Sequence, residues 1–294
     1  MPSSSGSRLW LGYALITTVA WGLWGALSAI PAQRGFPDTL TYAVWAICML
    51  LPAAFVLRRE GGKIPFDPRS LALGLTIGLT GAGGVIVLFP TLSMGPSYLI
   101  FPIISLSPLV TIALSAAFLR ERTGRIGVVG IVLALAALPF LNDWTPSGST
   151  VHFGLWFFLS LVILVSWGLQ NYFIKIAHAS MSTGAIFFYM TLGGLLLVPV
   201  ALVRTHWGEP INWGIDGPPL SAGIQLLNAV GALAIVYALR EGKAMVVSAL
   251  TNAASPLLTA LIAMALAGQI PGQFKIAGIA LAVIASALLA IGEE

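Results

Sequence analysis

The sequence predicts an all-α integral membrane protein with ten transmembrane helices, arranged as two inverted repeats of five helices each. Three observations support this fold class. The 294-residue chain is 58% hydrophobic and only 8% charged, whereas soluble domains carry about 25% charged residues, so most of its exterior must face lipid. Apolar runs long enough to cross a bilayer as helices, about 20 residues each, follow one another along the chain. Segments of the two halves also resemble each other.

The composition excludes several other classes of protein. Too few polar residues are present for a cytosolic enzyme, a secreted disulfide-linked domain or a disordered chain. The single cysteine, Cys48, forbids an intrachain disulfide and a multi-cysteine metal site. A net charge of +4 is too sparse for a nucleic-acid-binding protein. Because no catalytic cluster, metal or cofactor motif, or phosphate-binding glycine loop is recognisable, we expect neither an enzyme nor an ATP-driven pump.

Short polar, glycine- or proline-containing breaks divide the chain into ten apolar runs. The runs are continuously apolar rather than alternating, which favours helices over a β-barrel. The first run is too long for the apolar region of a signal peptide, and it carries Trp21 and Trp24 in its middle. In order, the predicted helices cover residues 9–30, 39–57, 70–93, 97–118, 125–141, 153–177, 183–203, 219–240, 244–266 and 273–291.

The clearest internal similarity links the fourth and fifth predicted helices to the ninth and tenth. Residues 105–137 align without gaps onto residues 253–285 at an offset of 148, and 11 of the 33 positions are identical. The identities include the pattern Ser-Pro-Leu-x-Thr, which begins at Ser107 and again at Ser255. Alanine- and leucine-rich helices match readily by chance, so this pattern and the shared glycines carry most of the weight.

A second similarity extends the repeat over the whole chain. The tripeptide Trp-Gly-Leu begins at Trp21 and again at Trp167, at an offset of 146. The sequence therefore predicts two halves, residues 1–142 and residues 143–294. Each half has five spans, an odd number, so the second half begins on the opposite side of the membrane from the first. Such inverted repeats are typical of transporters, which bind their substrate near the midplane between the repeats.

The basic residues predict the orientation of the chain. If the N-terminus lies in the cytoplasm, eleven of the fourteen Lys and Arg residues lie on the inside and three on the outside. This asymmetry follows the positive-inside rule, so we expect a multi-pass protein of the inner (cytoplasmic) membrane with both termini in the cytoplasm. The inside residues are Arg8, Arg58, Arg59, Lys63, Arg69, Arg120, Arg122, Arg125, Lys175, Arg240 and Lys243, and the outside residues are Arg34, Arg204 and Lys275.

A proline-containing helix, a short basic turn with an acidic residue and a glycine-containing helix follow one another at the end of the first half. They comprise Ser107-Pro108-Leu109, then Leu119-Arg120-Glu121-Arg122, then Gly127 to Gly130. With the five-plus-five layout, this order resembles the EamA-type carriers of the drug/metabolite transporter superfamily. In the second half Gln269 stands where that family usually has the acid. The resemblance implies a ten-helix carrier whose cavity is walled mainly by helices 1, 3, 4, 6, 8 and 9.

The deep polar residues are neutral. No Asp, Glu, Lys or Arg lies at mid-depth in a predicted span, which argues against a charged channel and against proton coupling through a midplane carboxylate. Neutral polar residues instead recur on single helix faces. The candidate substrate-binding residues are Trp21, Trp24, Ser107, Thr111, Trp167, Gln170, Asn171, Asn228, Asn252 and Ser255.

Each of these residue types also has a structural interpretation. Ser and Thr commonly join membrane helices or bond to their own backbone, and a central Trp commonly packs against neighbours or lipid. Asn and Gln are more costly to bury without partners and therefore favour a functional role. Pro108 and Pro256 lie near the centres of their predicted helices, where a proline removes a backbone hydrogen bond and bends the helix. They are candidate hinges, or inert bends.

The function most consistent with these features is secondary transport. We expect a small metabolite, resembling an amino acid or an amine, to be exported by alternating access as the two halves rock about the midplane. Uptake of a sugar or another neutral solute, lipid flipping, or a non-transporting scaffold are the alternatives. The expected partners are a small-molecule substrate and the lipid bilayer, without a cofactor or nucleic acid. The oligomeric state is open.

Overall fold

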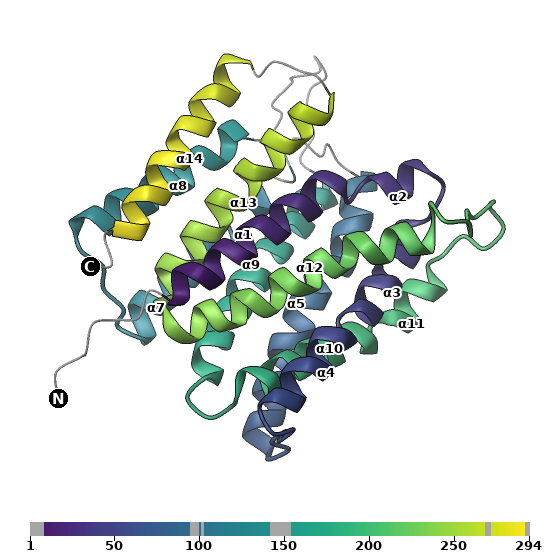
Figure 1. Ribbon diagram of the computed structural model, residues 1–294, viewed down its shortest axis with the longest axis horizontal. Coiled ribbons are helices and arrows are strands. Elements are labelled where there is room, and N and C mark those ends of the chain that lie inside the picture. Colours follow the sequence, from purple (N-terminus) through teal and green to yellow (C-terminus); the bar gives the residue numbers. More distant parts are fainter. Residues whose placement is uncertain (1–8, 95–99, 101–102, 142–153, 268–271, 292–294) are drawn as a thin grey trace.

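The computed structural model describes residues 9–94, 100, 103–141, 154–267 and 272–291, and every regular element within these ranges is an α-helix (Figure 1). Gln269 lies outside the described residues, as do residues 97–99 and 101–102 at the start of the fourth predicted span. The helices are α1 (Leu9–Leu27), α2 (Ile30–Gln33), α3 (Asp38–Cys48), α4 (Leu50–Arg59), α5 (Pro68–Met94), α7 (Pro108–Phe118), α8 (Arg125–Leu141), α9 (Leu155–Ala177), α10 (Thr183–Leu196), α11 (Val198–Val203), α12 (Pro218–Glu241), α13 (Ala244–Ala267) and α14 (Gln273–Ile291).

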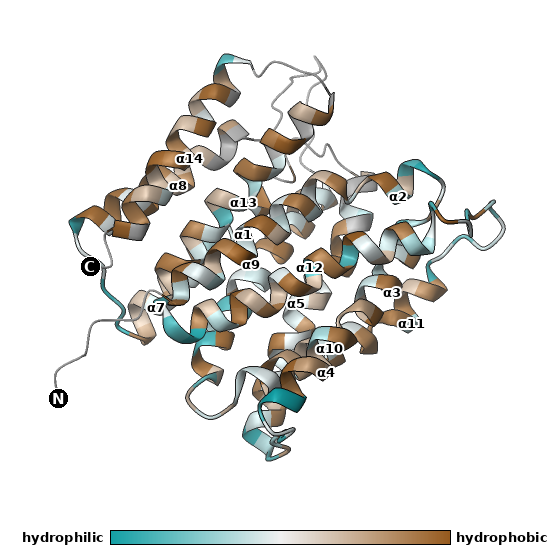
Figure 2. Cartoon of the chain, viewed as in Figure 1, coloured by the Kyte–Doolittle hydropathy of each residue, from teal (hydrophilic) through white to brown (hydrophobic). Residues whose placement is uncertain are grey.

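The helices have the length and the apolar surface that a membrane requires. In the described part of the chain, six helical segments are long and apolar enough to cross a bilayer, and four shorter apolar helices coincide with the remaining predicted spans. Large apolar side chains such as Leu51 and Phe55 are more than 60% exposed. Hydrophilic residues gather at the helix ends and in the connections (Figure 2). The prediction of a helical membrane protein is confirmed, while the count of ten spans and their inverted repetition stay predictions.

The two candidate hinge prolines occupy different positions in their helices. Pro256 lies inside α13, as expected. Pro108 is instead the first residue of α7, because residues 105–107 form a turn that interrupts the predicted span. In this turn the Ser107 amide donates to the Ile104 carbonyl over three residues, at 3.1 Å. A proline fits the first position of a helix because its missing N–H would have no partner there, so Pro108 begins α7 directly after this turn. Its role as a hinge stays a prediction.

Helices that are distant in the sequence pack side by side. Helix α1 lies against α12 and α13, whereas α9 lies against α5 and α7. Helix α8 packs along α14 at one side of the molecule (Figure 1). The first helix of each predicted half is therefore held mainly by helices of the other half.

Helices α5 and α10 approach so closely that their backbones touch. Gly78 of α5 and Gly193 of α10 face each other, and a Cβ atom added to either would overlap the backbone of the opposite helix. A Cβ at Gly78 would meet the carbonyl oxygen of Tyr189. Small residues permit such close contact in membranes, where van der Waals packing rather than water drives helix association.

We predict that Gly78→Ala destabilises the protein by forcing α5 away from α10. The added methyl group meets backbone rather than a movable side chain, and overpacking of this kind costs about 1–3 kcal/mol. Thermal unfolding of the purified protein in detergent measures the effect as a lower midpoint. Gly83→Ala in the same helix is the matched control, because among the described residues no atom outside the backbone of its own helix lies within 4 Å of a Cβ there. Equal midpoints for the two variants would contradict the close contact.

Candidate functional site

Trp21 of α1 is fixed against α12 by a hydrogen bond and by close packing of its ring on a glycine. Its indole Nε1 donates to the backbone carbonyl of Asn228 at 3.3 Å. Its ring lies against Gly231, where a Cβ atom would overlap it. The acceptor and the glycine are three residues apart and so lie on one face of α12.

Trp167 of α9 makes the same arrangement with α5. Its Nε1 donates to the backbone carbonyl of Gly81 at 3.3 Å, and its ring lies against Gly84, which a Cβ atom would again bring into overlap. The acceptor and the glycine are once more three residues apart. The two tryptophans that begin the repeated Trp-Gly-Leu tripeptides therefore have equivalent surroundings.

The glycines of the same tripeptides accept hydrogen bonds from the two Ser-Pro-Leu-x-Thr segments. Thr111 Oγ1 of α7 donates to the carbonyl of Gly168 at 2.9 Å, and Thr259 Oγ1 of α13 donates to the carbonyl of Gly22 at 3.0 Å. A side chain at either glycine would overlap the threonine-bearing helix. Each threonine thus holds its helix against a tripeptide helix, which is a structural role for the predicted site residue Thr111.

Two further indoles converge on α12. Trp24 Nε1 donates to Gln225 Oε1 at 3.1 Å, and Trp45 Nε1 of α3 donates to Asn228 Oδ1 at 2.8 Å. The N–H groups of Trp21, Trp24 and Trp45 are therefore all used by the protein. Sequence analysis did not select Trp45 or Gln225 as site residues, although Gln225 lies one helical turn before Asn228.

Asn171 and Asn252 are joined through a third residue that sequence analysis left out of the site. Asn171 Nδ2 of α9 donates to the hydroxyl oxygen of Ser248 at 3.3 Å, and Asn252 Nδ2 donates to the backbone carbonyl of Ser248 at 2.9 Å. Ser248 itself is fully buried. Its spacing of four residues from Asn252 on α13 was the signal available in the sequence.

The remaining candidates lie at separate positions. The Gln170 amide lies against Gly81 and forms no hydrogen bond to the residues that the structure describes. Ser107 is buried beside α9. Ser255 is buried, and its hydroxyl finds no partner in the described ranges. The structure thus brings Trp21, Trp24 and Asn228 together, and joins Asn171 to Asn252. No hydrogen bond among described residues connects these two groups.

Comparison with known proteins identifies the family. A model of the EamA-like transporter family matches residues 8–142 and 154–291. The chain belongs to this family. An uncharacterized transporter from Archaeoglobus fulgidus is 30% identical over 151 residues. The aligned region covers 49% of this chain and 50% of that protein, so the match spans about half the length of each.

A solved crystal structure has the same fold as this EamA-family chain. The two superpose with a TM-score of 0.76 and 18% sequence identity, and the superposition covers 94% of this chain and 97% of the other. At this identity the likeness concerns the fold alone. The family is one of membrane transporters, for which small molecules are the substrates. Within the described residues, no group of three or more His, Cys, Asp or Glu is placed to hold a metal ion.

At the end of the molecule where α4, α7, α9 and α12 finish, two carboxylates of the EamA chain cap helices. Glu60 accepts from the Gly184 amide at the start of α10 at 2.7 Å and from the Tyr237 hydroxyl at 3.2 Å. Glu121 accepts from the amides of Ala244 and Met245 at the start of α13 at 3.0 and 3.1 Å. Free amides at a helix start favour a carboxylate. We name this end the basic end, because it carries Arg58, Arg59, Lys175 and Arg240.

The turn that presents Glu121 has an unusual backbone. Arg120 has a φ of 54°, in the left-handed region that non-glycine residues adopt rarely. The amides of Leu119 and Glu121 both donate to the Ser115 carbonyl, at 3.1 and 3.2 Å, and close the end of α7. This conformation turns the chain so that the Glu121 carboxylate reaches α13. The acid of the family-like Leu-Arg-Glu-Arg turn therefore serves as a cap for a distant helix.

His178 at the basic end is held neutral. Burial lowers its pKa from 6.5 to about 4, and the nearby positive charges of Lys175 and Arg240 act in the same direction. A hydrogen bond of 3.0 Å joins His178 Nε2 to the Val236 carbonyl. Because a carbonyl only accepts, Nε2 carries the proton and donates. Beside it, Lys175 Nζ donates to the Gly242 carbonyl at 2.6 Å.

We predict that mild acid destabilises the protein through His178. Between pH about 6.5 and 4 the imidazole is protonated in the unfolded chain but stays neutral in the folded one. The unfolded state therefore binds more protons, and the free energy of unfolding falls as the pH is lowered through this interval. His178→Gln, which keeps a donor for Val236, should reduce the drop in unfolding midpoint between pH 7 and pH 5. His206→Gln, at an exposed histidine, should leave the drop unchanged.

Proposed function

We propose that this chain is a secondary transporter that moves a small amino-acid- or amine-like metabolite out of the cell by alternating access. It would do so as ten transmembrane helices in two inverted halves, residues 1–142 and 143–294, with both termini in the cytoplasm. Membership of the EamA-like family supports transport, and the two separate matches of the family model support the division into halves. The eleven-to-three distribution of basic residues supports the orientation.

Paired contacts support the inverted repeat. Trp21 contacts α12 as Trp167 contacts α5. The acceptors Asn228 and Gly81 differ by 147 positions, between the offsets of 146 and 148 that the sequence alone supplies. Four helices in two pairs thus share one pattern of contacts, which a twofold axis in the membrane plane would generate.

The hydrogen bonds between helices support a proposal about which helices move together. Helix α1 is bonded to α12 and α13, and α9 is bonded to α5 and α7. We therefore propose that the two moving bodies are mixed, one containing α1 with α12 and α13 and the other containing α9 with α5 and α7. The bonds of Asn171 with Ser248 and of His178 with Val236 join these two bodies and would break when they separate. Rocking of the sequence halves themselves would break all four of these hydrogen bonds.

The observation that carries the substrate proposal is a set of carboxamide groups with unused bonding capacity in the spans. The amide N–H groups of Gln170 and Asn228 have no partner among the described residues, nor do the amide oxygens of Asn171 and Asn252. The former are donors that suit a carboxylate, and the latter are acceptors that suit an ammonium group. Indole faces, whose N–H groups are already bonded, also attract cations. A solute that carries both a carboxylate and an ammonium group could use both kinds of amide.

We predict that Gln170→Leu and Asn228→Leu each raise the apparent KM for an amino-acid-like solute by about tenfold or more, because a hydrogen bond to a charged group contributes about 1.5–3 kcal/mol. Counterflow of labelled amino acids and amines into proteoliposomes measures the effect. Thr80→Val is the matched control, because the Thr80 hydroxyl is already bonded to its own helix through the Thr76 carbonyl at 2.6 Å.

The same measurement has outcomes that contradict the proposal. If no solute of a broad metabolite panel shows saturable, counterflow-stimulated flux with the wild-type protein, it is not a metabolite carrier. If fluorescent phospholipids cross the bilayer instead, the protein is a flippase. Flux that the Gln170 and Asn228 variants affect no more than Thr80→Val would retain transport but remove these residues from the site.

A further inference from the structure

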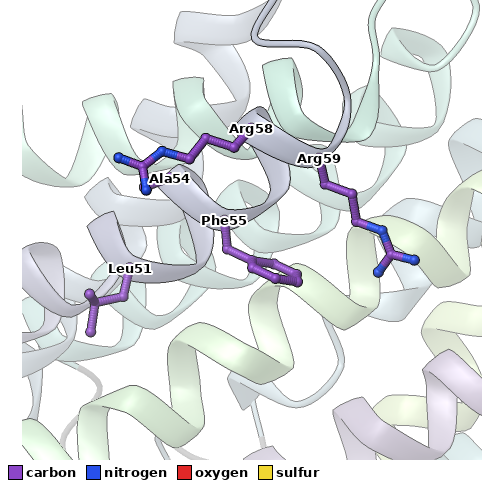
Figure 3. Close-up of a pocket in the computed structure, with 5 residues that line it drawn as sticks. All are labelled: Leu51, Ala54, Phe55, Arg58 and Arg59. Atoms are coloured by element: carbon purple, nitrogen blue, oxygen red, sulfur yellow. The ribbon is translucent and has the colours of Figure 1, made fainter.

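Two adjoining hollows lie on the outer face of α4, away from the candidate substrate site. The larger has a volume of about 660 Å³ and lies at the basic end. The smaller, of about 200 Å³, continues along the side of α10 and shares Ala54 with the larger one. The larger is lined by Leu51, Ala54, Phe55, Arg58 and Arg59 (Figure 3). We call the two hollows together the α4 groove.

The α4 groove is apolar along its length. The smaller hollow lies between α4 and α10 and is lined by Ala53 and Ala54 on one side and by Phe188 and Leu192 on the other, whereas the larger is an open surface of α4 alone. Leu51 and Phe55 project beside it and are 66% and 62% exposed. Leu50 and Arg58 are eight residues apart, which on a helix is about 12 Å. One leaflet of hydrocarbon is about 15 Å deep. The groove is therefore nearly as long as the part of an acyl chain that lies in one leaflet.

Two arginines follow the apolar residues of α4 at the basic end. Arg58 and Arg59 are exposed, and neither forms a hydrogen bond or ion pair to the residues that the structure describes. The adjacent acid, Glu60, is already bonded to Gly184 and Tyr237. The two guanidinium groups extend to either side of Phe55 (Figure 3). Positive charge that no acid of the described residues neutralises therefore stands where the apolar surface ends.

We propose that the α4 groove binds an anionic phospholipid, with an acyl chain along α4 and α10 and its phosphate beside Phe55, where the long side chains of Arg58 and Arg59 would turn toward it. Planar guanidinium groups suit phosphate oxygens, and basic sites between transmembrane helices bind anionic headgroups. A second copy of the chain fits less well. In a twofold dimer the same surface meets itself, which would bring the four arginines together. The inference uses the proposed orientation to name the cytoplasmic leaflet, but it does not depend on transport.

Native mass spectrometry of the delipidated full-length protein, titrated with dioleoyl phosphatidylglycerol or dioleoyl phosphatidylcholine, tests this site. We expect one tightly bound phosphatidylglycerol and much weaker phosphatidylcholine. Arg58→Gln with Arg59→Gln should weaken phosphatidylglycerol binding about 25-fold, because each basic group near an anionic lipid surface contributes about fivefold. Arg122→Gln with Arg125→Gln removes the same charge from exposed positions outside the groove and should leave binding unchanged.

A second variant tests the apolar part of the site. Ala54→Trp fills the α4 groove while both arginines remain, and it should weaken phosphatidylglycerol binding in a protein whose unfolding midpoint is unchanged. Equal affinity of the wild type for the two lipids would overturn the proposal. So would equal losses in the two double-arginine variants, or a dimer that Ala54→Trp dissociates without a change in lipid binding. Absence of solute flux with retained phosphatidylglycerol binding would contradict only the proposed transport.

Discussion

The structure depends on how two helices, α1 and α9, are held by helices from distant parts of the chain. Each carries a Trp-Gly pair, and in each the indole N–H bonds to one neighbouring helix while the glycine carbonyl accepts from a threonine of another. In a bilayer no water competes for these groups, and close packing has to replace the hydrophobic effect between helices. The glycines allow that packing, and the hydrogen bonds fix its register.

Neutral polar groups in this protein divide between holding helices and remaining available. The fold uses the hydroxyls of Thr111 and Thr259 and the indole N–H groups of Trp21, Trp24, Trp45 and Trp167, whereas several carboxamides retain bonding capacity. Charged groups act at the helix ends instead. There Glu60 and Glu121 provide negative charge for the starts of α10 and α13. The membrane thus separates the two kinds of chemistry by depth, because an ionised group is costly within hydrocarbon.

Hydropathy predicts the helical elements well because membrane insertion is a local property of about 20 residues. Sequence alone also found Trp21, Trp167 and both Ser-Pro-Leu-x-Thr segments, since repetition is visible without coordinates. It did not find which helix each of them contacts, because those contacts join positions as much as 237 residues apart. Pro108 was misplaced because a turn cannot be told from a helix bend by composition. Trp45 was left out because the acceptor that fixes it lies on a distant helix.

The packing of α1 has a consequence for synthesis. Helix α1 ends at residue 27 and its partner α12 begins at residue 218, which is 191 residues later. At about 5–20 residues per second, ribosomes need roughly 10–40 s to produce that length. During this interval the Trp21 indole and the packing face around Gly22 have neither α12 nor α13 beside them. Helix α1 is made before either of these partners, so it reaches its native position only after α12 and α13 have been synthesised.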